Sequence, residues 1–403
     1  MSRIVIVATL CAAAAGLTFA LPALMLTELS EAEAANTRIR VPQDQPTLQA
    51  AIDAAGPGFT ISLTPGTYSE NVVIAGKTDL RIDGRGSVLN GGGATALEIL
   101  DSTMVSLKRL VLSNGTPYAL LIRGTSADIT ISKCEFADAA TAGVLVDNPV
   151  ARVTIEKCEF VGLPGHGIRA NPGATELRVV GNEFLDVAGI GIALAYEGGG
   201  IGVPNSVIEK NHLASIGQHG VVFGGDGTMV SKNRIEGVTN GWGIAVDDST
   251  STLGAVIERN RVSGAGGGGI RCLWTGATVT KNRVEDIEWV GLLAGGADHL
   301  LLGNYVSDAR TAGIRLTGTG STAERNKVRQ GKDDGFQVEG TGHTLLGNQS
   351  RGNNKYGYYV TGAGHAISRN TAKGNGDFDL WDLAGLGANT YVKNRFPKEK
   401  FWL

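Results

Sequence analysis

The sequence has little cysteine, little proline and no excess of positive charge, and each shortage excludes a class of protein. Its 403 residues include 4 Cys and 11 Pro, and the formal charge is −3. This charge argues against nucleic acid as a partner, because phosphate binding favours a basic stripe. The cysteines lack a C-x-x-C spacing, so neither a zinc site nor a disulfide framework is predicted. Glycine is abundant, with 59 residues, but it follows no collagen period and comes without proline enrichment, which argues against collagen and against disorder.

The segment 1–34 is typical of an export signal. Arg3 is followed by an uncharged apolar run over residues 4–26, and Ala32-Glu33-Ala34 has the small residues that a signal peptidase requires. The run approaches the length of a bilayer span, so an uncleaved membrane anchor is the alternative. We therefore expect a secreted, periplasmic or cell-envelope protein that touches a membrane only through this segment, if it is uncleaved.

Two sequence markers recur along the rest of the chain. The first marker is an Asn that recurs from Asn182 to Asn370, in most copies with an apolar residue two places after it. Its spacing is constant over Asn260, Asn282, Asn304, Asn326, Asn348 and Asn370. A Gly followed by an apolar residue comes about nine places after each Asn, as in Gly335-Phe336. Two markers in step over many copies indicate a repeat protein.

Each repeat contains short segments in which apolar and polar residues alternate, which is typical of half-buried strands. A repeat of roughly 22 residues is too short for a strand–helix–strand unit, which needs roughly 30, but it suffices for one coil of three short strands. Stacked coils of this kind form a parallel β-helix. We expect the recurring Asn to adopt a left-handed backbone conformation at a tight turn and to bond the Asn of the next coil through its side-chain amide.

Both ends of the repeat carry expected caps. Leu48, Ala51, Ile52 and Ala55 share one face of a short helix predicted near residues 46–55, with Thr47 as its N-cap. The chain is expected to divide into a signal or anchor (1–34), an N-terminal cap with the first coils (35–100), the β-helix repeats (101–380) and a C-terminal cap (381–403).

Cys134 and Cys158 occupy the Asn position on two early coils, one repeat apart. We expect a buried pair of thiols on a stacked row. A disulfide is the alternative, since Cα atoms stacked ~4.8 Å apart fall within bridging range.

The segment "TLQAAIDAAGPGFTISLTPGTYSENVVI", followed by these coils, resembles the right-handed parallel β-helix repeat proteins of the pectin-lyase-like superfamily. The resemblance covers nearly all of the chain after residue 34. It implies an all-β fold, a single-stranded right-handed parallel β-helix with a short N-terminal capping helix. It also implies a polysaccharide as the partner, because the superfamily includes pectate and alginate lyases, epimerases, polygalacturonases and phage tailspikes. A shared fold does not decide among these activities.

In each strand that begins at the Gly marker, the residue after Gly should point inward and the following one should face solvent. In superfamily enzymes this sheet forms the sugar groove. "KDDG" then places Asp334 at the exposed edge of the groove. Glycoside hydrolysis needs two carboxylates ~5–9.5 Å apart, whereas Asp334 and Glu339 are ~16 Å apart along an extended strand. We therefore interpret Asp333-Asp334 as a polar turn, and a glycoside hydrolase is disfavoured.

A polysaccharide lyase or epimerase needs a cation to neutralise the uronate carboxylate and a base near the sugar. Arg271 and Arg315 should lie on one outward row two coils apart, ~10 Å at the strand spacing. The candidate catalytic residues are Arg271, Arg315, Lys332, Asp334 and His219. The candidate substrate-binding residues are Trp242, Asp247, Trp274, Gln337, Tyr356 and Tyr359.

No metal site is predicted, and no cofactor is required by the sequence. Asp247-Asp248 leaves Ca²⁺ as an alternative, although calcium binding needs six to eight oxygen ligands. His343 and His365 are one repeat apart, and we expect them to stack as a surface row rather than as a metal pair.

Two functions remain open. The first is an exported protein that binds an acidic polysaccharide, with cleavage or epimerisation of that polysaccharide left open. The second is a non-catalytic envelope protein, such as a glycan-binding scaffold, an adhesin or an accessory maturation factor. A cleft where Lys, Arg and His converge would favour the first, and an open aliphatic face containing Val222, Ala245 and Leu293 would favour the second.

Overall fold

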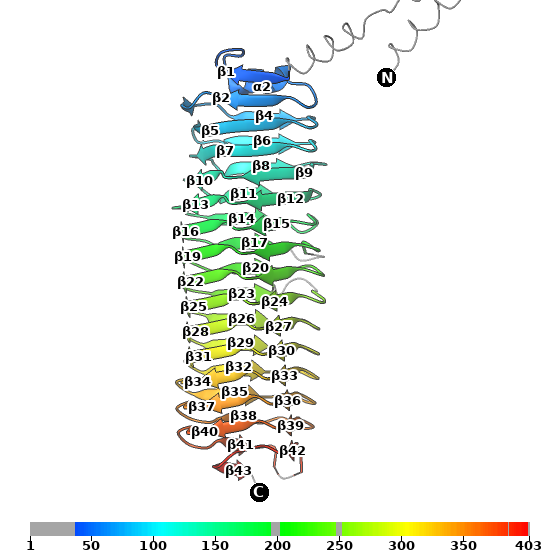
Figure 1. Ribbon diagram of the computed structural model, residues 1–403, viewed down its shortest axis with the longest axis vertical. Helices are drawn as coiled ribbons and strands as arrows, with labels where there is room; N and C mark the ends of the chain where they lie inside the picture. Colours follow the sequence, from blue (N-terminus) through cyan, green and yellow to red (C-terminus); the bar gives the residue numbers. More distant parts are fainter. Residues whose placement is uncertain (1–36, 195–201, 247–251, 386, 402–403) are drawn as a thin grey trace, which may run out of the picture. The chain divides into compact units, whose positions relative to one another are not determined.

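The computed structural model describes residues 37–194, 202–246, 252–385 and 387–401. The predicted signal segment and Asp247 lie outside these ranges. Within them the chain forms the predicted β-helix, and successive coils stack along one axis (Figure 1). The described ranges contain no helix that is both long and apolar enough to cross a bilayer.

Two parallel sheets form the walls of the β-helix. Sheet B, with 15 strands in the described residues, consists of β4 (Val72–Ala75), β6 (Leu97–Leu100), β8 (Tyr118–Arg123), β11 (Ala142–Val146), β14 (His166–Ala170), β17 (Ile192–Leu194), β20 (Val221–Phe223), β23 (Trp242–Val246), β26 (Gly268–Cys272), β29 (Val290–Ala294), β32 (Ala312–Leu316), β35 (Asp334–Val338), β38 (Tyr358–Val360), β41 (Leu380–Asp382) and β43 (Glu399–Phe401).

Sheet A, with 28 strands, covers the other two sides of each described coil. The strands of its first coils are β1 (Arg38–Val41), β2 (Thr60–Leu63), β3 (Thr67–Tyr68), β5 (Arg81–Asn90) and β7 (Ser106–Ser113). The strands before the Asn corner are β9 (Ala127–Ser132), β12 (Ala151–Glu156), β15 (Arg178–Val180), β18 (Val207–Glu209), β21 (Met229–Ser231), β24 (Val256–Glu258), β27 (Thr278–Thr280), β30 (Leu300–Leu302), β33 (Thr322–Glu324), β36 (Thr344–Leu346), β39 (Ala366–Ser368) and β42 (Thr390–Val392). The strands after it are β10 (Glu135–Ala137), β13 (Glu159–Val161), β16 (Glu183–Val187), β19 (His212–Ile216), β22 (Arg234–Val238), β25 (Arg261–Ala265), β28 (Arg283–Ile287), β31 (Tyr305–Ala309), β34 (Lys327–Arg329), β37 (Gln349–Arg351) and β40 (Thr371–Lys373).

The core fills the interior of the coils with stacked apolar side chains. Phe136, Phe160 and Phe184 are fully buried, and their rings stack at centroid distances of 4.8 and 4.5 Å. These distances match the strand spacing, because each Phe sits at the same place on successive coils. Residues that follow the Gly marker, such as Phe336 and Val338, also point inward and are buried, as predicted.

The recurring Asn forms a buried hydrogen-bonded row at one corner of the coil. The Asn260 side chain, for example, donates from Nδ2 to Asn282 Oδ1 at 3.0 Å and to the Val230 carbonyl at 2.9 Å. The predicted bond between neighbouring Asn side chains is thus confirmed, and the row continues to Asn394. The predicted left-handed conformation is wrong for Asn itself, because the residue before it has the positive φ, such as 54° at Arg259.

Cys134 and Cys158 continue this row toward the N-terminus, as expected. Both are buried free thiols, and Cys158 Sγ accepts the Cys134 amide at 3.4 Å. The Cys158 amide in turn donates to Asn182 Oδ1 at 2.9 Å. The two sulfurs therefore occupy Asn positions as the start of the ladder.

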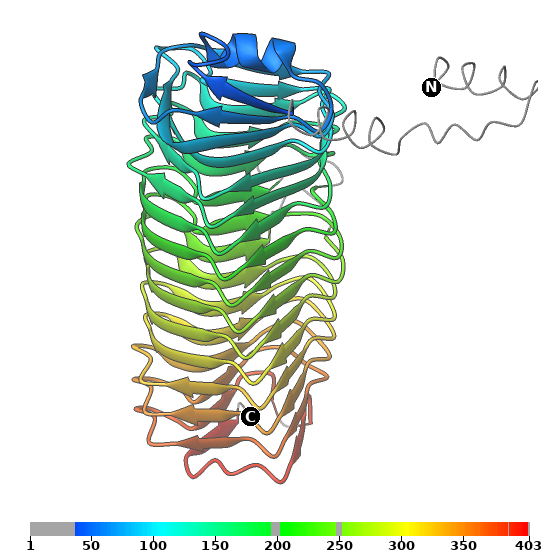
Figure 2. The same cartoon turned by 45° about the horizontal axis from the view of Figure 1, so that its top comes forward.

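The predicted N-terminal helix is α2 (Leu48–Ala54), which lies across one end of the coils (Figure 2). Thr47 is its N-cap and accepts the Ala50 amide at 3.1 Å. Leu48, Ala51 and Ile52 are buried, and so is Ala55 just beyond the helix, so the predicted apolar face is confirmed.

The expectation that His343 and His365 lie on the surface is wrong. They are 0% and 1% exposed, and their rings stack at 5.1 Å. Each Nδ1 accepts a backbone amide of the preceding coil, that of Ser321 or of His343, at 3.1 Å. Both side chains face inward, and these hydrogen bonds link the stacked β32–β33, β35–β36 and β38–β39 turns.

Candidate functional site

The outer face of sheet B carries one continuous row of side chains toward its C-terminal end. Strand pairing aligns the members of this outward row: Arg271, Leu293, Arg315, Gln337, Tyr359, Trp381 and Lys400. Arg271 and Arg315 are two strands apart on it, as predicted. All seven are at least partly exposed, so this row can touch a ligand.

Four aromatic rings gather at the end of the outward row, and we call them the aromatic platform: Tyr356, Tyr359, Phe378 and Trp381. Tyr356 stacks on Tyr359 at 5.5 Å and meets Trp381 edge-on at 4.6 Å. Phe378 lies 6.4 Å from both Tyr356 and Trp381. All four rings are partly exposed, and the ammonium of Lys400 lies 5.5 Å from Phe378 and 5.6 Å from Trp381. Such a surface offers apolar ring faces together with a cation.

Charged side chains border the platform in pairs. Arg315 forms an ion pair with Glu339 at 3.0 Å, and both side chains are about one-third exposed. Lys355 forms an ion pair with Asp333 at 2.8 Å, which raises the pKa of Lys355. The border is therefore close to neutral, with donors and acceptors side by side.

Asp334 is buried rather than exposed, and the expectation of an accessible groove edge is wrong for it. Its side chain is 4% exposed and accepts the Gln337 Nε2 group at 2.9 Å and the Tyr356 amide at 3.2 Å. Burial raises the pKa of Asp334 to about 6, with Asp333 adding to the shift. The two hydrogen bonds hold the carboxyl against the next coil, which leaves it no room to reach a substrate.

The same position serves a backbone role on other coils. His219 Nδ1 accepts the Trp242 amide at 2.9 Å, and His166 Nδ1 accepts the Ile190 amide at 3.0 Å. Asp334 and these two histidines thus each accept the amide of the residue one coil farther on. Asp334 is the first residue of β35, so the predicted polar turn ends at Asp333.

The tryptophans upstream differ in exposure. Trp242 is 5% exposed, so the prediction that it binds substrate is wrong. Its ring meets Trp289 edge-on at 5.5 Å, and the Arg271 guanidinium lies 5.6 Å from it. Trp274 is 37% exposed and follows the end of β26.

The middle of the outward face is not the open aliphatic surface that the sequence suggested. Val222 and Ala245 are 3% and 0% exposed, and they belong to a second apolar cluster with Ile190, Trp242 and Val290. Small side chains stacked beside a Trp ring shield one another here, so only Leu293 of the expected face is partly exposed.

The five candidate catalytic side chains do not converge. His219 lies just before β20, and β20 is five strands away from β35, which begins at Asp334. At the usual strand spacing, His219 and Asp334 are therefore ~24 Å apart. Lys332 is exposed in the turn before β35, and Arg315 is engaged by Glu339. In the part of the chain that the structure describes, three or more His, Cys, Asp or Glu side chains nowhere gather into a metal site.

Three residues of this site were missed in the sequence: Phe378, Trp381 and Lys400. Phe378 and Trp381 lie one repeat after Tyr356 and Tyr359, so the repeat itself could have found them. The segment from residue 381 was expected to form a C-terminal cap, yet β41 still pairs in register with β38.

The comparisons with known proteins agree with the fold. The family model for the right-handed beta helix region matches residues 70–235 and 219–376. The tailspike receptor-binding domain of siphovirus 9NA is 14% identical, with a TM-score of 0.60 over 88% of this chain and 76% of that chain. The alginate lyase AlyF-OU02, solved in complex with G6, is 12% identical, with a TM-score of 0.54 over 89% and 83%. At these identities the similarity establishes the fold alone. The curated proteins contain no match.

Proposed function

The chain belongs to the right-handed β-helix family, and we propose that it binds a polysaccharide along the outward row of sheet B. The observation that carries this proposal is the aromatic platform, four partly exposed rings on adjacent coils. A sugar ring presents C–H groups that pack on an aromatic face and hydroxyls that need hydrogen-bond partners at its edge. Gln337, Glu339 and Arg315 lie beside the rings and offer both donors and acceptors.

The direction of the row favours a polymer over a single sugar. Gln337, Tyr359, Trp381 and Lys400 are aligned across adjacent strands, so they follow the β-helix axis at ~4.8 Å intervals. A linear glycan lying along the axis would meet one of these side chains on each coil. Two structural neighbours, the tailspike receptor-binding domain and the alginate lyase solved with G6, support a glycan as the ligand class. Lys400 and Arg271 favour an acidic glycan.

We propose binding rather than cleavage or epimerisation. A uronate lyase needs a base and a charge-neutralising cation at the same sugar. Here the Asp334 carboxyl is buried, and Arg315 is paired with Glu339. Burial and nearby carboxylates raise the phenol pKa of Tyr356, so less of the ionised form is available near neutral pH to act as a base. Residues 1–34 support a secreted, periplasmic or envelope location, and mass spectrometry of the mature N-terminus would test whether the segment is removed.

The test is affinity electrophoresis of the protein in gels that contain alginate, polygalacturonate, xylan or a neutral glucan. The gels are run at high salt, which screens attraction between charges and leaves the stacking of sugars on the aromatic rings. We expect retardation by at least one polysaccharide, lost in Tyr359→Ala and Trp381→Ala. Tyr305→Ala is the matched control, because Tyr305 is another partly exposed ring with a cation 4.7 Å from its centroid, on sheet A.

Equal retardation of all three variants would refute the platform as the binding site. The same polysaccharides are incubated with the protein and followed by ultraviolet absorbance, which reports an unsaturated lyase product, and by NMR, which reports a change of sugar stereochemistry. Turnover in either measurement would replace binding by catalysis.

A further inference from the structure

The corner of the coil just before the Asn ladder carries a row of exposed cations. The register of sheet A aligns one residue on each of thirteen coils. On most coils this residue lies two places before the strand that follows the Asn corner, such as β10 or β13. These positions, which we call the corner row, are Arg109, Lys133, Lys157, Gly181, Lys210, Lys232, Arg259, Lys281, Gly303, Arg325, Gly347, Arg369 and Lys393. Ten are Lys or Arg and three are Gly, and all ten cations are exposed.

Backbone geometry alone does not explain these cations. Every non-Gly member has a φ between 53° and 57°, in the left-handed region that suits Gly, Asn and Asp. Elsewhere in the described chain only two cations, Arg85 and Arg152, take this conformation. Nine acidic residues take it: Asp79, Asp101, Asp128, Asp138, Glu176, Asp186, Asp286, Asp298 and Asp308. None of these acids falls in the corner row. The charge preference of left-handed positions is therefore reversed at this corner, which indicates a requirement for positive charge there.

Most of the corner row is not neutralised by neighbours. Arg109 pairs with Asp83, Lys210 and Lys232 share Glu209, and Arg325 pairs with Glu324. The other six cations form no ion pair with a carboxylate in the described ranges: Lys133, Lys157, Arg259, Lys281, Arg369 and Lys393. Long-range attraction of an anion thus survives along most of the corner, although the chain has a formal charge of −3.

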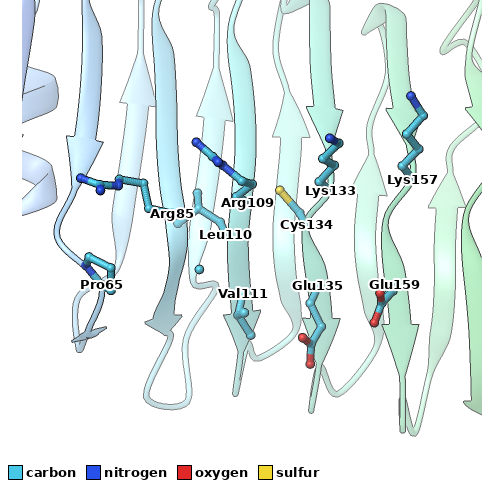
Figure 3. Close-up of a pocket in the computed structure, with 11 residues that line it drawn as sticks. Pro65, Arg85, Arg109, Leu110, Val111, Lys133, Cys134, Glu135, Lys157 and Glu159 are labelled. Atoms are coloured by element: carbon cyan, nitrogen blue, oxygen red, sulfur yellow. The ribbon is translucent and has the colours of Figure 1, made fainter.

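The N-terminal end of the corner row borders a depression of about 630 Å³. Figure 3 shows Arg85, Arg109, Lys133 and Lys157 side by side along one rim, with Glu135 and Glu159 along the other. Pro65, Leu110 and Val111 also line the depression. Because the cations of successive coils stand ~4.8 Å apart, this rim matches an extended chain with closely repeated anionic groups.

We propose that the corner row binds a single linear polyanion lengthwise, with phosphate or carboxylate groups repeated along its backbone. The ligand would enter at the depression and follow the corner for up to ~58 Å, twelve strand spacings. A single chain fits because the cations form one line, with acidic side chains on the far rim of the depression. A nucleic acid duplex, whose two strands present a broad charged surface, would need a wider basic patch. This surface is separate from the aromatic platform.

The corner row allows charge removal without a threat to the fold. Gly occurs naturally at three of its positions and adopts the left-handed conformation without strain. The test variant carries Lys133→Gly, Lys157→Gly, Arg259→Gly and Lys281→Gly. The matched control carries Asp138→Gly, Asp186→Gly, Asp286→Gly and Asp308→Gly, which makes the same backbone change at exposed left-handed positions of opposite charge.

Binding of inorganic polyphosphate and of oligogalacturonate is measured by fluorescence anisotropy over a series of salt concentrations. We expect the unmodified protein to bind at low salt and the corner variant to bind at least ~10-fold more weakly. Removing four contacts should also flatten the slope of log K against log salt by about 3, at ~0.7 per contact for a single chain. The control should bind as well as the unmodified protein or more tightly. The tighter of the two probes identifies phosphate or carboxylate as the preferred anion.

Three results would overturn the proposal: no binding by the unmodified protein at low salt, equal affinity of the corner variant, or tighter binding of duplex DNA of matched charge. Polyphosphate has no sugar to stack on the aromatic platform, and the platform is tested at high salt. Failure of this proposal can therefore be distinguished from failure of the proposed glycan binding.

Discussion

Truncating one Asn in the middle of the buried ladder should destabilise the protein strongly. Asn282 makes four side-chain hydrogen bonds. Its Oδ1 accepts the Asn260 amide at 2.9 Å and Asn260 Nδ2 at 3.0 Å. Its Nδ2 donates to the Ile257 carbonyl at 2.8 Å and to Asn304 Oδ1 at 3.0 Å. In Asn282→Ala all four are lost, and the site is too deeply buried for water to replace them, since Asn282 is 1% exposed.

The magnitude follows from the donors left without acceptors. Asn260 keeps its Nδ2 bond to Val230 but loses an acceptor for its backbone amide and for the second Nδ2 hydrogen. A buried donor without a partner costs ~1–3 kcal/mol, so Asn282→Ala should lower the free energy of unfolding by about 3 kcal/mol. The end of the ladder provides a matched control: Asn394 accepts the same two donors from Asn370, at 2.8 and 3.2 Å, but it is partly exposed. Water can replace the bonds there, and Asn394→Ala should cost about 1 kcal/mol.

Urea unfolding followed by circular dichroism measures both costs from the shift in midpoint at unchanged slope. A cost below about 1 kcal/mol for Asn282→Ala, or equal costs for the two variants, would refute the view that the ladder's buried hydrogen bonds hold the coils in register.

Three further changes test buried polar groups. The Tyr358 hydroxyl is fully buried and has no hydrogen-bond partner in the described ranges, so Tyr358→Phe should raise stability in urea by about 1 kcal/mol; a loss of stability would contradict this. For Asp334 the folded pKa of about 6 lies above the ordinary 3.8, so the contribution of this carboxyl to stability should fall as pH rises from 4 to 7. Asp334→Asn should therefore gain up to about 2 kcal/mol relative to wild type across that range; a pH-independent difference would refute the shift. For His365 burial lowers the pKa from 6.5 to about 4, so the contribution of this imidazole to stability is complete above pH 6.5 and falls by about 3 kcal/mol as pH drops to 4. His365→Asn should reduce this loss relative to wild type; an unaltered acid midpoint would count against it.

The sequence predicted the features that depend on periodicity. The intervals between Asn residues set the coil, and the structure aligns Arg271 with Arg315 and Gln337 with Tyr359 as those intervals require. The helix over α2 was predicted because its apolar spacing and its Thr cap are both local signals.

Exposure could not be predicted in the same way. Alternation tells which side of a strand a residue faces, but it does not tell what packs against that side. Trp242 and Asp334 both lie where an accessible groove edge was expected, and both are buried. Trp242 packs on Trp289, and Asp334 bonds the next coil, and both contacts join residues that are distant in sequence.

The left-handed corner was assigned to the wrong residue for a physical reason. Asn tolerates positive φ better than Lys or Arg does, so intrinsic preference pointed to Asn. In the fold the Asn side chain is needed inside the ladder, and the preceding residue takes the strained conformation with its side chain in solvent. That shift by one residue concealed the corner row.

The most direct test of the proposed glycan binding is an NMR titration that follows the tryptophan indole N–H signals as the tightest-binding oligosaccharide is added. Stacking of a sugar on the aromatic platform should shift the Trp381 signal, assigned through Trp381→Phe, and leave the signal of the buried Trp242 in place. Saturation with Trp381 unmoved, or with shifts confined to Trp274 or Trp289, would contradict the account, because the glycan would then bind away from the four rings at the C-terminal end of sheet B.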